Sequence, residues 1–370
     1  MSTKKKILYV SLRSGFGGAT MHINQLVKNF NNIYDIYCAA PIEKPYGEKW
    51  MEKLGKDKFL ELPYRSFSVK HLIQLISFTK KNKIDIIHAH GKGAGIYSRL
   101  AKIFIPKIYL IYTLHGLHIE NYSKSLKFIY IFIERILDKL TNIIINVSNG
   151  EKQLCLDNKL FKMNKSVVIY NGIEDDANYY PTKTELRKKL LLPIDKFLIV
   201  SVIRFNTQKN IKAMLEIAQR LSDDKAFMFV LIGDGEQRPA IEKEINDNII
   251  DNVKLLGYQT NVDEYLHASD IFLSTSRWEG LPYSLIEATR GRIPIIASNV
   301  TGNNEIVFDK YNGYLFEVND IDFATNLLKE LKDSDETLDT FGQNSRKVFK
   351  EYFMLERMVN KLKEVYSNTN

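Results

Sequence analysis

The chain has 370 residues, 45% of them hydrophobic and 26% charged, a length and composition that suit two or three globular domains. Its two cysteines, Cys38 and Cys155, are too few for a disulfide framework or a cysteine-based metal cluster, which favours a reducing cytosol. The sequence has no run of about 18 apolar residues, so we expect no segment that spans a membrane.

The net charge of +8 is unevenly distributed along the chain. Residues 1–170 carry 27 lysines and arginines against 12 aspartates and glutamates, a net of +15, whereas residues 171–370 carry 25 against 32, a net of −7. A basic half can contact nucleic acid, anionic lipid or a phosphorylated acceptor. Because no nucleic-acid recognition motif is present, we expect no nucleic-acid partner. A solvated basic surface and an anionic membrane contact remain as interpretations.

Strand-like and helix-like segments alternate from the N-terminus onward. Arg13 interrupts the first apolar run too early for a signal peptide, so that run predicts a strand. The alternation predicts βαβ units and a parallel sheet. The strands expected in the first half are Ile7–Leu12, Asp35–Ala40, Ile84–Ala89, Tyr109–Leu114, Asn142–Val147 and Val167–Tyr170, with helices that include His22–Phe30, Val69–Lys81 and Gly95–Phe104.

A second alternating set follows Glu174–Pro181, which we interpret as a linker, and a periodic helix at Leu355–Tyr366 ends the chain. We therefore predict an α/β protein with two Rossmann-like domains that face each other across a cleft. The expected divisions are 1–175, 185–352 and a C-terminal helical segment at 353–370. The strands expected in the second half are Phe197–Ile203, Phe227–Ile232, Val253–Leu256, Ile271–Ser274, Pro294–Ser298 and Tyr314–Phe316.

A glycine-rich loop, Gly15–Gly18, follows the first predicted strand, where a Rossmann domain binds phosphate. It is a poor dinucleotide fingerprint, because Thr20 replaces the third glycine and the second strand ends at Cys38–Pro41 without an acid for a ribose. An NAD-dependent oxidoreductase is therefore disfavoured. The loop remains a place where backbone can approach a phosphate or a sugar.

Histidines end the next two strands, His88 and His90 in one and His115 in the other. We expect no metal here, because His118 is predicted a turn away and no nearby acids complete a ligand shell. His115 is interpreted either as a contact for a sugar or diphosphate, or as a structural histidine.

One helical segment, Leu126–Leu140, is apolar nearly all round and begins beside Lys124 and Lys127. The first interpretation is a helix buried in the core. The alternative is a helix that lies partly in a bilayer surface and is flanked by lysines.

Arg204 and Lys209 follow the strand Phe197–Ile203, and Asn210 then opens a helix. Two fixed cations near a helix start can clamp a diphosphate. When a glycosyl bond to a diphosphate breaks, negative charge grows on the leaving oxygen, and preorganised cations stabilise that charge. A solvated basic turn is the alternative interpretation.

Two glutamates, Glu279 and Glu287, stand eight positions apart on either side of a Gly-Leu-Pro turn and a predicted helix start. Glu279 is expected at the carboxyl end of a strand, where open α/β sheets bind ligands. Free amides at the helix start can bind an anion. Carboxylates on both sides of an anion site suit a nucleotide-sugar, which has hydroxyls at both ends and a diphosphate between them. Two solvated surface acids are the alternative.

These segments, in this order, resemble the retaining family 4 glycosyltransferases of GT-B fold over nearly the whole chain. The segments that carry the resemblance are Phe16–Ala19, Asp85–His90, Thr113–Gly116, Val168–Ile173, Arg204 with Lys209–Asn210, Ile232–Gly235, Leu256–Gly257, Ala268–Asp270, Ser276, Glu279–Glu287, Gly302–Glu305 and Asn312–Gly313.

The resemblance implies a role for each candidate residue in turn. Arg204 and Lys209 would bind the donor diphosphate, and Glu287 would hold the ribose hydroxyls. Glu279 would contact the transferred sugar, and His115 would line the reaction centre. Further donor contacts are implied for Gly17, Gly18, Gly280, Leu281, Pro282 and Tyr283.

The same resemblance implies that no metal or other cofactor is needed and that the C-terminal helix crosses back to the N-terminal domain. Two departures concern the donor loop. Arg292 stands where a glycine is usual, two residues before Pro294, and Thr301 replaces the first glycine of a usual pair.

We therefore predict a retaining, metal-independent glycosyltransferase that moves a sugar from a UDP-linked donor to a glycan or polyprenyl-diphosphate-linked acceptor. The Glu-Gly-Leu-Pro variant resembles members that build bacterial O-antigens, capsules and other surface polysaccharides. We expect a cytoplasmic protein at the inner face of the plasma membrane. A nucleotide-sugar epimerase and a non-catalytic sugar- or lipid-binding module are the alternatives.

Overall fold

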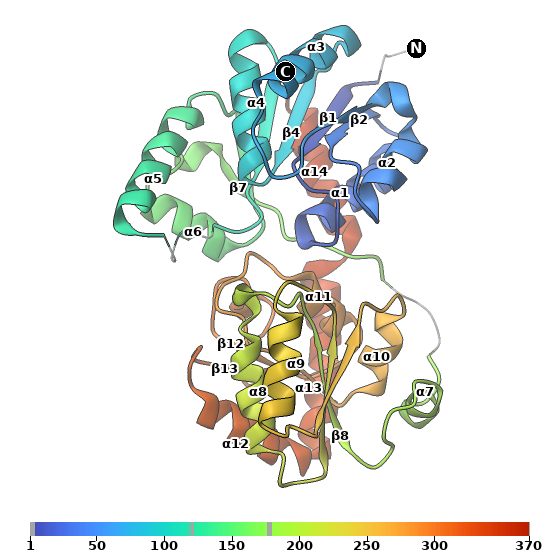
Figure 1. Ribbon diagram of the computed structural model, residues 1–370. Helices are drawn as coiled ribbons and strands as arrows, with labels where there is room; N and C mark the ends of the chain where they lie inside the picture. Colours follow the sequence, from blue (N-terminus) through green and yellow to red (C-terminus); the bar gives the residue numbers. More distant parts are fainter. Residues whose placement is uncertain (1–3, 118, 120–121, 176–179, 370) are drawn as a thin grey trace. The chain divides into compact units, whose positions relative to one another are not determined.

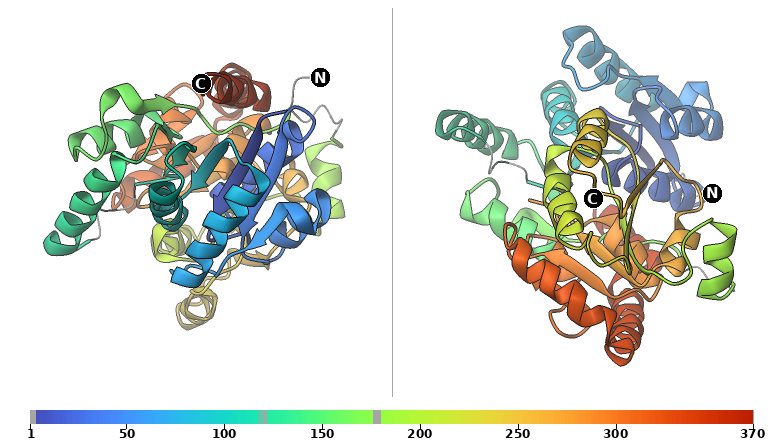
Figure 2. Two further views of the ribbon diagram at one scale, coloured as in Figure 1. Left: turned by 90° about the horizontal axis from the view of Figure 1, so that it is seen from above. Right: turned by 60° about the horizontal axis from the view of Figure 1, so that its bottom comes forward.

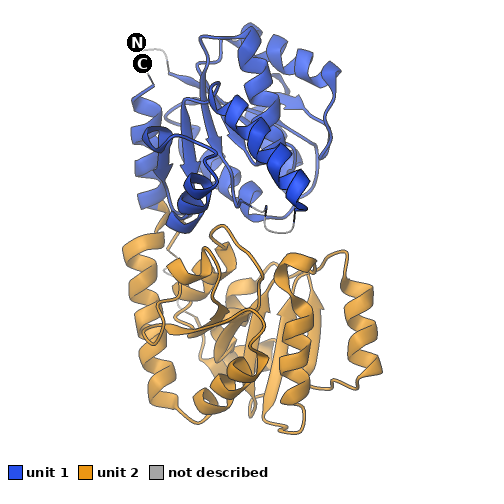
Figure 3. Ribbon diagram, turned by 90° about the vertical axis from the view of Figure 1, so that its left-hand side faces the viewer, with its two compact units in different colours: residues 1–171, 356–370 blue, residues 172–355 orange. Residues whose placement is uncertain are grey.

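The computed structural model describes residues 4–117, 119, 122–175 and 180–369 of the chain. These residues form two compact units (Figure 3): unit 1 comprises 1–171 and 356–370, and unit 2 comprises 172–355. His118 and the centre of the predicted linker, residues 176–179, lie outside the described residues. In each unit, helices alternate with parallel strands, so the predicted fold of two Rossmann-like domains is confirmed.

Unit 1 is built on a seven-stranded parallel sheet in the order β3-β2-β1-β4-β5-β6-β7 (Figure 1). Its strands are apolar runs rather than alternating patterns, because helices cover both faces of such a sheet. β3 was not predicted, since three residues at a sheet edge give no periodic pattern. The strands are β1 (Lys6–Ser11), β2 (Asp35–Ala40), β3 (Phe59–Glu61), β4 (Ile86–His90), β5 (Tyr109–Thr113), β6 (Ile143–Asn146) and β7 (Ser166–Val168).

The helices of unit 1 come from both ends of the chain. They are α1 (Gly18–Phe30), α2 (Tyr46–Leu54), α3 (Val69–Asn82), α4 (Lys92–Phe104), α5 (Lys124–Asp138), α6 (Asn149–Asp157) and α14 (Leu355–Ser367), with short 3-10 turns at Lys56–Lys58 and Met163–Lys165.

Unit 2 is built on a six-stranded parallel sheet in the order β10-β9-β8-β11-β12-β13. The strands are β8 (Phe197–Val202), β9 (Phe227–Ile232), β10 (Val253–Gly257), β11 (Ile271–Ser274), β12 (Ile295–Ser298) and β13 (Gly313–Phe316). The helices are α7 (Lys183–Lys189), α8 (Ile211–Arg220), α9 (Arg238–Asp247), α10 (Val262–Ala268), α11 (Tyr283–Arg290), α12 (Ile321–Lys332) and α13 (Asp335–Val348), with 3-10 turns at Thr207–Lys209 and Asn303–Glu305 and a π-helical turn at Phe349–Phe353.

Both sheets reverse their strand order beside their first strand. In unit 1 the reversal lies between β1 and β4, and in unit 2 it lies between β8 and β11. Open α/β sheets bind ligands at such a switch point, outside the carboxyl ends of the strands. The loops that follow these four strands are therefore where the fold favours a site.

The C-terminal helix α14 belongs to unit 1 (Figure 3). Tyr366 is fully buried there, and its hydroxyl lies 2.7 Å from Nδ1 of His88. The ring of Tyr366 also packs edge-on against those of Phe30 and Tyr34. The return of the C-terminal helix to the N-terminal domain is thus confirmed.

The apolar helix predicted at Leu126–Leu140 is α5, and the core interpretation of it is wrong. The side chains of Phe128 and Phe132 are 71% and 56% exposed. The side of α5 that faces unit 1 carries the buried Glu134, Leu137 and Asp138, and the partly buried Tyr130 and Ile131 also pack against the core there. The sequence pattern could not predict this orientation, because in a helix that is apolar nearly all round no polar side marks which face is exposed.

Candidate active site

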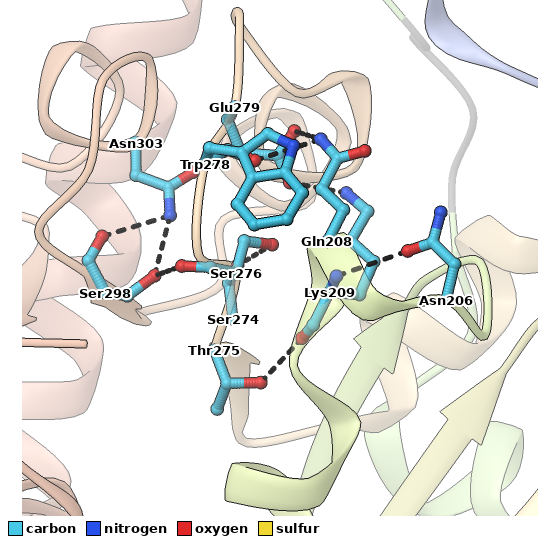
Figure 4. A network of polar contacts seen from close by, with 10 residues as sticks. All are labelled: Asn206, Gln208, Lys209, Ser274, Thr275, Ser276, Trp278, Glu279, Ser298 and Asn303. Carbon is cyan, nitrogen blue, oxygen red and sulfur yellow. Dashed lines mark hydrogen bonds and ion pairs between the residues drawn. The ribbon is translucent and has the colours of Figure 1, made fainter. Parts of the chain in front are cut away.

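Two loops of unit 2 meet at its switch point, one after β8 and one after β11. The backbone amide of Arg277 donates to the carbonyl of Gln208 at 2.8 Å. The hydroxyl of Thr275 donates to the carbonyls of Lys209 and Asn210 at 3.0 and 3.1 Å. These bonds hold the two loops together, and Figure 4 shows the one between Thr275 and Lys209.

The central contact of this site is an ion pair between Lys209 and Glu279. Nζ of Lys209 lies 2.6 Å from Oε1 of Glu279, and the two side chains are 16% and 7% exposed. A charge this far from water is costly to bury alone, so the attraction between the two side chains offsets part of that cost. The sequence analysis predicted both residues at one site, with the donor diphosphate as the partner of Lys209 and the transferred sugar as the partner of Glu279. In the structure they bind each other.

Gln208 completes this contact, and sequence reasoning missed it. Its Nε2 donates to Oε2 of Glu279 at 3.2 Å and to the carbonyl of Trp278 at 2.9 Å (Figure 4). The amide therefore fixes the carboxylate oxygen that Lys209 does not contact. Its position could have indicated this role, because Gln208 directly precedes Lys209 in the sequence.

Arg204, the other predicted cation, lies in a more open environment. Its guanidinium is 3.6 Å from the carboxylate of Glu236, and the two side chains are 40% and 62% exposed. Water screens such a pair, so it contributes little to stability and competes weakly with an incoming anion.

The turn after Glu279 leads directly into α11 and is held by a glycine. Gly302 has φ +85°, and a Cβ there would lie 2.4 Å from the carbonyl oxygen of Gly280. Only glycine fits such a close approach of two backbones. Behind the turn, Nδ2 of Asn303 donates to the carbonyl of Ser298 at 3.0 Å, which braces the segment.

Glu287 lies in the second turn of α11 and is half-buried. Burial raises its pKa to about 7. Arg290 opposes this rise and Asp263 adds to it, and these two residues pair with each other. Glu287 therefore changes charge near neutral pH.

In unit 1 the glycine-rich loop is closed by Thr20. Its hydroxyl is 2.6 Å from the carbonyl oxygen of Gly15 and 2.8 Å from that of Gly17, and α1 begins at Gly18. The residue at the third-glycine position thus ties the loop to the helix. The carboxylate of Glu43 accepts from the backbone amide of Ser14 at 3.0 Å.

His115 sits on a tight turn at the end of β5. It has φ +61°, and Gly116 after it has φ +109°. The buried carboxylate of Glu151 accepts from the amide of Gly116, and at 2.7 Å from that of Val147, so it fixes the turn. Nε2 of His115 lies 3.0 Å from Nδ1 of His90.

Four histidines gather around this turn and are electrically neutral. Burial lowers the pKa of His22 to about 4, and burial with neighbouring histidines lowers the pKa values of His88, His90 and His115 well below the usual range. Among the described residues, no three histidine, cysteine, aspartate or glutamate side chains are arranged as ligands for a metal ion. His118 lies outside those residues, and no role is assigned to it.

A cavity of about 610 Å³ in unit 2 lies at the opposite end of its sheet. It is lined by residues before β11 and β12, including Asp270, Arg292 and Pro294. The amino ends of parallel strands are not where this fold binds nucleotides. Arg292, which stands where the family usually has a glycine, lines this cavity. It is therefore remote from the start of α11.

Two family descriptions match the chain in succession. "Glycosyltransferase Family 4" matches residues 16–177, and "Glycosyl transferases group 1" matches residues 182–348. An Escherichia coli protein, UDP-Gal:alpha-D-GlcNAc-diphosphoundecaprenol alpha-1,3-galactosyltransferase, is 32% identical over 80% of this chain and 79% of its own. The chain is a family 4 glycosyltransferase.

Other relatives and solved structures agree with this assignment. The capsular polysaccharide biosynthesis glycosyltransferase CapM of Staphylococcus aureus is 24% identical over 81% of this chain and 80% of its own. The structure of Anabaena HepE in complex with UDP and glucose has a TM-score of 0.86 at 17% identity, over 98% of this chain and 99% of that one. This likeness shows the GT-B fold of the glycosyltransferase.

Proposed function

We propose that this glycosyltransferase moves a sugar from a UDP-linked donor to a glycan or polyprenyl-diphosphate-linked acceptor, with retention of configuration and without a metal. The observation that carries the proposal is the buried pair of Lys209 and Glu279 at the switch point of unit 2, with Arg204 on the same loop.

The donor diphosphate takes Arg204 and Lys209 as its cations. Lys209 then exchanges the carboxylate of Glu279 for phosphate oxygens, and Arg204 exchanges the screened contact with Glu236. Glu279 keeps the bond from Gln208 and turns to hydroxyls of the transferred sugar. The pair thus holds both groups charged and in position before the donor arrives, which lowers the cost of organising the site.

The rest of the donor is held by α11 and the turn before it. The N-cap residue of α11 is Pro282, whose side chain provides no acceptor, and the helix dipole favours an anion at that end. Gly280, Leu281 and Tyr283 line the approach to the helix, and Glu287 accepts from the ribose hydroxyls. In unit 1, the Gly17–Gly18 loop is assigned to the diphosphate and His115 to the reaction centre.

Charge development in the reaction suits this set of groups. As the glycosyl–oxygen bond breaks, the sugar becomes oxocarbenium-like and negative charge grows on the leaving phosphate. Arg204 and Lys209 stabilise that charge in place of a metal ion. Glu279 is assigned to the hydroxyls of the transferred sugar and not to the role of a nucleophile. We therefore assign a same-face attack in which the leaving phosphate accepts the proton of the acceptor hydroxyl.

The acceptor is proposed from the relatives and from charge. The Escherichia coli relative is named for a lipid-diphosphate-linked acceptor, and others are named for O-antigen or capsule synthesis. Within the described ranges, no helix is long and apolar enough to cross a membrane. Work at the cytoplasmic face of an anionic membrane fits a first half with a net charge of +15.

A donor panel tests this proposal. Nucleotide release is measured with each nucleotide-sugar, with and without a polyprenyl-diphosphate-linked acceptor and with EDTA. We expect release from a UDP-sugar that requires the acceptor, and an α-linked product from an α-linked donor. Conversion of the donor to a different sugar without acceptor would identify an epimerase, and no turnover of any donor would favour a binding module.

A further inference from the structure

The helix α5 is mounted on unit 1 with its polar groups inward. Glu134 is 1% exposed, and its carboxylate lies 2.7 Å from Nη1 of Arg99, which is 0% exposed. The guanidinium of Arg99 also stacks 4.1 Å above the ring centre of Tyr112. One turn further, the main-chain carbonyl of Asp138 accepts from Nζ of Lys165 at 2.9 Å.

The ends of α5 are fixed as well. The hydroxyl of Ser123 accepts from the amide of Leu126 at the N-terminus. At the other end, Arg135 donates to the carbonyls of Lys159 and Asn158 at 3.0 and 3.1 Å. The helix is thus anchored to the body of unit 1 through these polar contacts and through Tyr130 and Ile131, which pack against the core of that unit. Figures 1 and 2 show it at the outer side of unit 1.

The outward side of α5 is a continuous apolar face. The exposed fractions range from 44% to 71%, so these side chains lie in solvent rather than in a core. Scattered single apolar residues are ordinary on a surface, whereas a whole helical face is not. The members of the face are Leu126, Phe128, Ile129, Phe132, Ile133 and Ile136.

The exposed charged side chains of α5 have one sign. Between Lys124 and Lys139, both acidic residues, Glu134 and Asp138, are buried, whereas Lys124, Arg135 and Lys139 are exposed. A second copy of the chain would bring like charges together across an apolar contact. Anionic headgroups instead match the cations while acyl chains take the apolar side chains.

The length of α5 decides how it meets a bilayer. With 15 residues it is about 22 Å long, which is shorter than the hydrocarbon core of roughly 30 Å. It therefore cannot cross a membrane and can lie in the plane of the interface, with its apolar face at the boundary between headgroups and acyl chains.

We propose that α5 is an in-plane membrane anchor that binds anionic bilayers through this face. The inference extends the proposed function by naming the surface of unit 1 that meets the membrane of a lipid-linked acceptor. The binding itself requires neither the donor nor the acceptor, so it can be tested apart from transfer.

The test is co-sedimentation of the full chain with vesicles. We expect binding to vesicles that contain phosphatidylglycerol at low salt, release at high salt, and little binding to phosphatidylcholine alone. The double variant Phe128→Ser/Phe132→Ser should lower the partition coefficient by about 100-fold. Lys124→Glu/Lys127→Glu should lower it by at least about tenfold and weaken its dependence on salt.

A matched control comes from unit 2, where Leu191 and Ile249 are each 82% exposed. Leu191→Ser/Ile249→Ser should bind vesicles as the unchanged chain does. All variants should keep nearly the same melting temperature, since every changed side chain is exposed except that of Lys127, which is half-buried. No binding to anionic vesicles at low salt would overturn the proposal, as would equal loss of binding in the unit 2 control.

Two further measurements separate other outcomes. Transfer to a short, water-soluble acceptor should be unchanged in the Phe128→Ser/Phe132→Ser variant. If vesicle binding is normal but no donor is turned over, the anchor stands and the proposed function fails. Concentration-dependent dimerisation that these substitutions abolish, without any vesicle binding, would identify the face as an interface between copies and overturn the membrane proposal.

Discussion

Units 1 and 2 share a strand order at their centres, yet their switch points carry opposite chemistry. Beside β8 and β11, unit 2 has a buried ion pair, a second cation and a carboxylate that titrates near neutrality. Beside β1, β4 and β5, unit 1 has a glycine loop and histidines that burial keeps neutral. The same scaffold is therefore specialised by its loops, with charge for a diphosphate in one unit and neutral polar groups in the other.

The largest expected effect comes from the cations of unit 2. Arg204→Ala and Lys209→Ala should each lower kcat by about 10²–10³, because each removes a preorganised charge that faces the leaving group. Lys209→Ala should also lower stability, since it leaves Glu279 buried without its partner. Steady-state kinetics and thermal melting measure both effects. Lys212→Ala, an exposed lysine on α8, is the control. Normal kcat in either active-site variant would refute the assigned clamp.

The two glutamates should separate chemistry from binding. Glu279→Gln should lower kcat by about 10² with little change in UDP affinity, because its partner is the reacting sugar. Glu287→Ala should weaken UDP binding by about 10- to 100-fold, as expected for a lost hydrogen bond to a charged group. Calorimetry with UDP and kinetics with the full donor decide between them. Equal loss of UDP affinity in both would show that the division of roles is wrong.

Every described strand except β3, the order in which the strands follow one another, and most residues of the candidate site in unit 2 could be predicted from the sequence, because long apolar runs and polar residues at strand ends are local patterns. The contact between Lys209 and Glu279 could not be predicted, since it joins loops 70 positions apart. The role of Glu151 was missed for the same reason: it fixes the turn after His115 from 35 positions away. The direction in which α5 turns its apolar face depends on the buried pair of Arg99 and Glu134. The spacing of apolar residues along the helix gives no information about that pair.

The raised pKa of Glu287 predicts how donor binding varies with pH. A carboxylate is the better acceptor for ribose hydroxyls, and with a pKa of about 7 it is mostly protonated at pH 6. Affinity for a nucleotide-sugar should therefore rise by about tenfold between pH 6 and pH 8. The titration uses a nucleotide-sugar as its ligand because a diphosphate that is esterified at both ends keeps the same charge at both pH values. Titrations at both pH values should show this rise, and Glu287→Gln should abolish it.

Acid should weaken unit 1 and spare unit 2. Unfolded histidines have a pKa of about 6.5, so below that pH the unfolded chain takes up protons that the native His22, with its pKa of about 4, does not. The native pKa of Glu287 is instead raised, so unit 2 gains stability as the pH falls through about 7. Hydrogen exchange at pH 7.5 and 5.5, corrected for intrinsic rates, should show protection lost first in unit 1. Equal loss in both units would contradict the comparison.

The smallest effect is expected at Arg292, far from the start of α11. Its φ of +59° is unfavourable for any residue with a side chain, so Arg292→Gly should raise the free energy of unfolding of unit 2 by up to about 1 kcal/mol. Activity should not change. Denaturant melts and kcat measure the two results, and a large loss of activity would mean that this side chain serves the donor site after all.

The most direct test of the central claim is the rate of acceptor-dependent nucleotide release, measured in excess EDTA and again in excess Mg²⁺. The unchanged chain should be equally active in both, and Arg204→Ala/Lys209→Ala should be inactive in both, because two side chains stabilise the charge of the leaving diphosphate. Activity that is lost in EDTA and restored by Mg²⁺ would contradict the account, since a metal ion would then have that role.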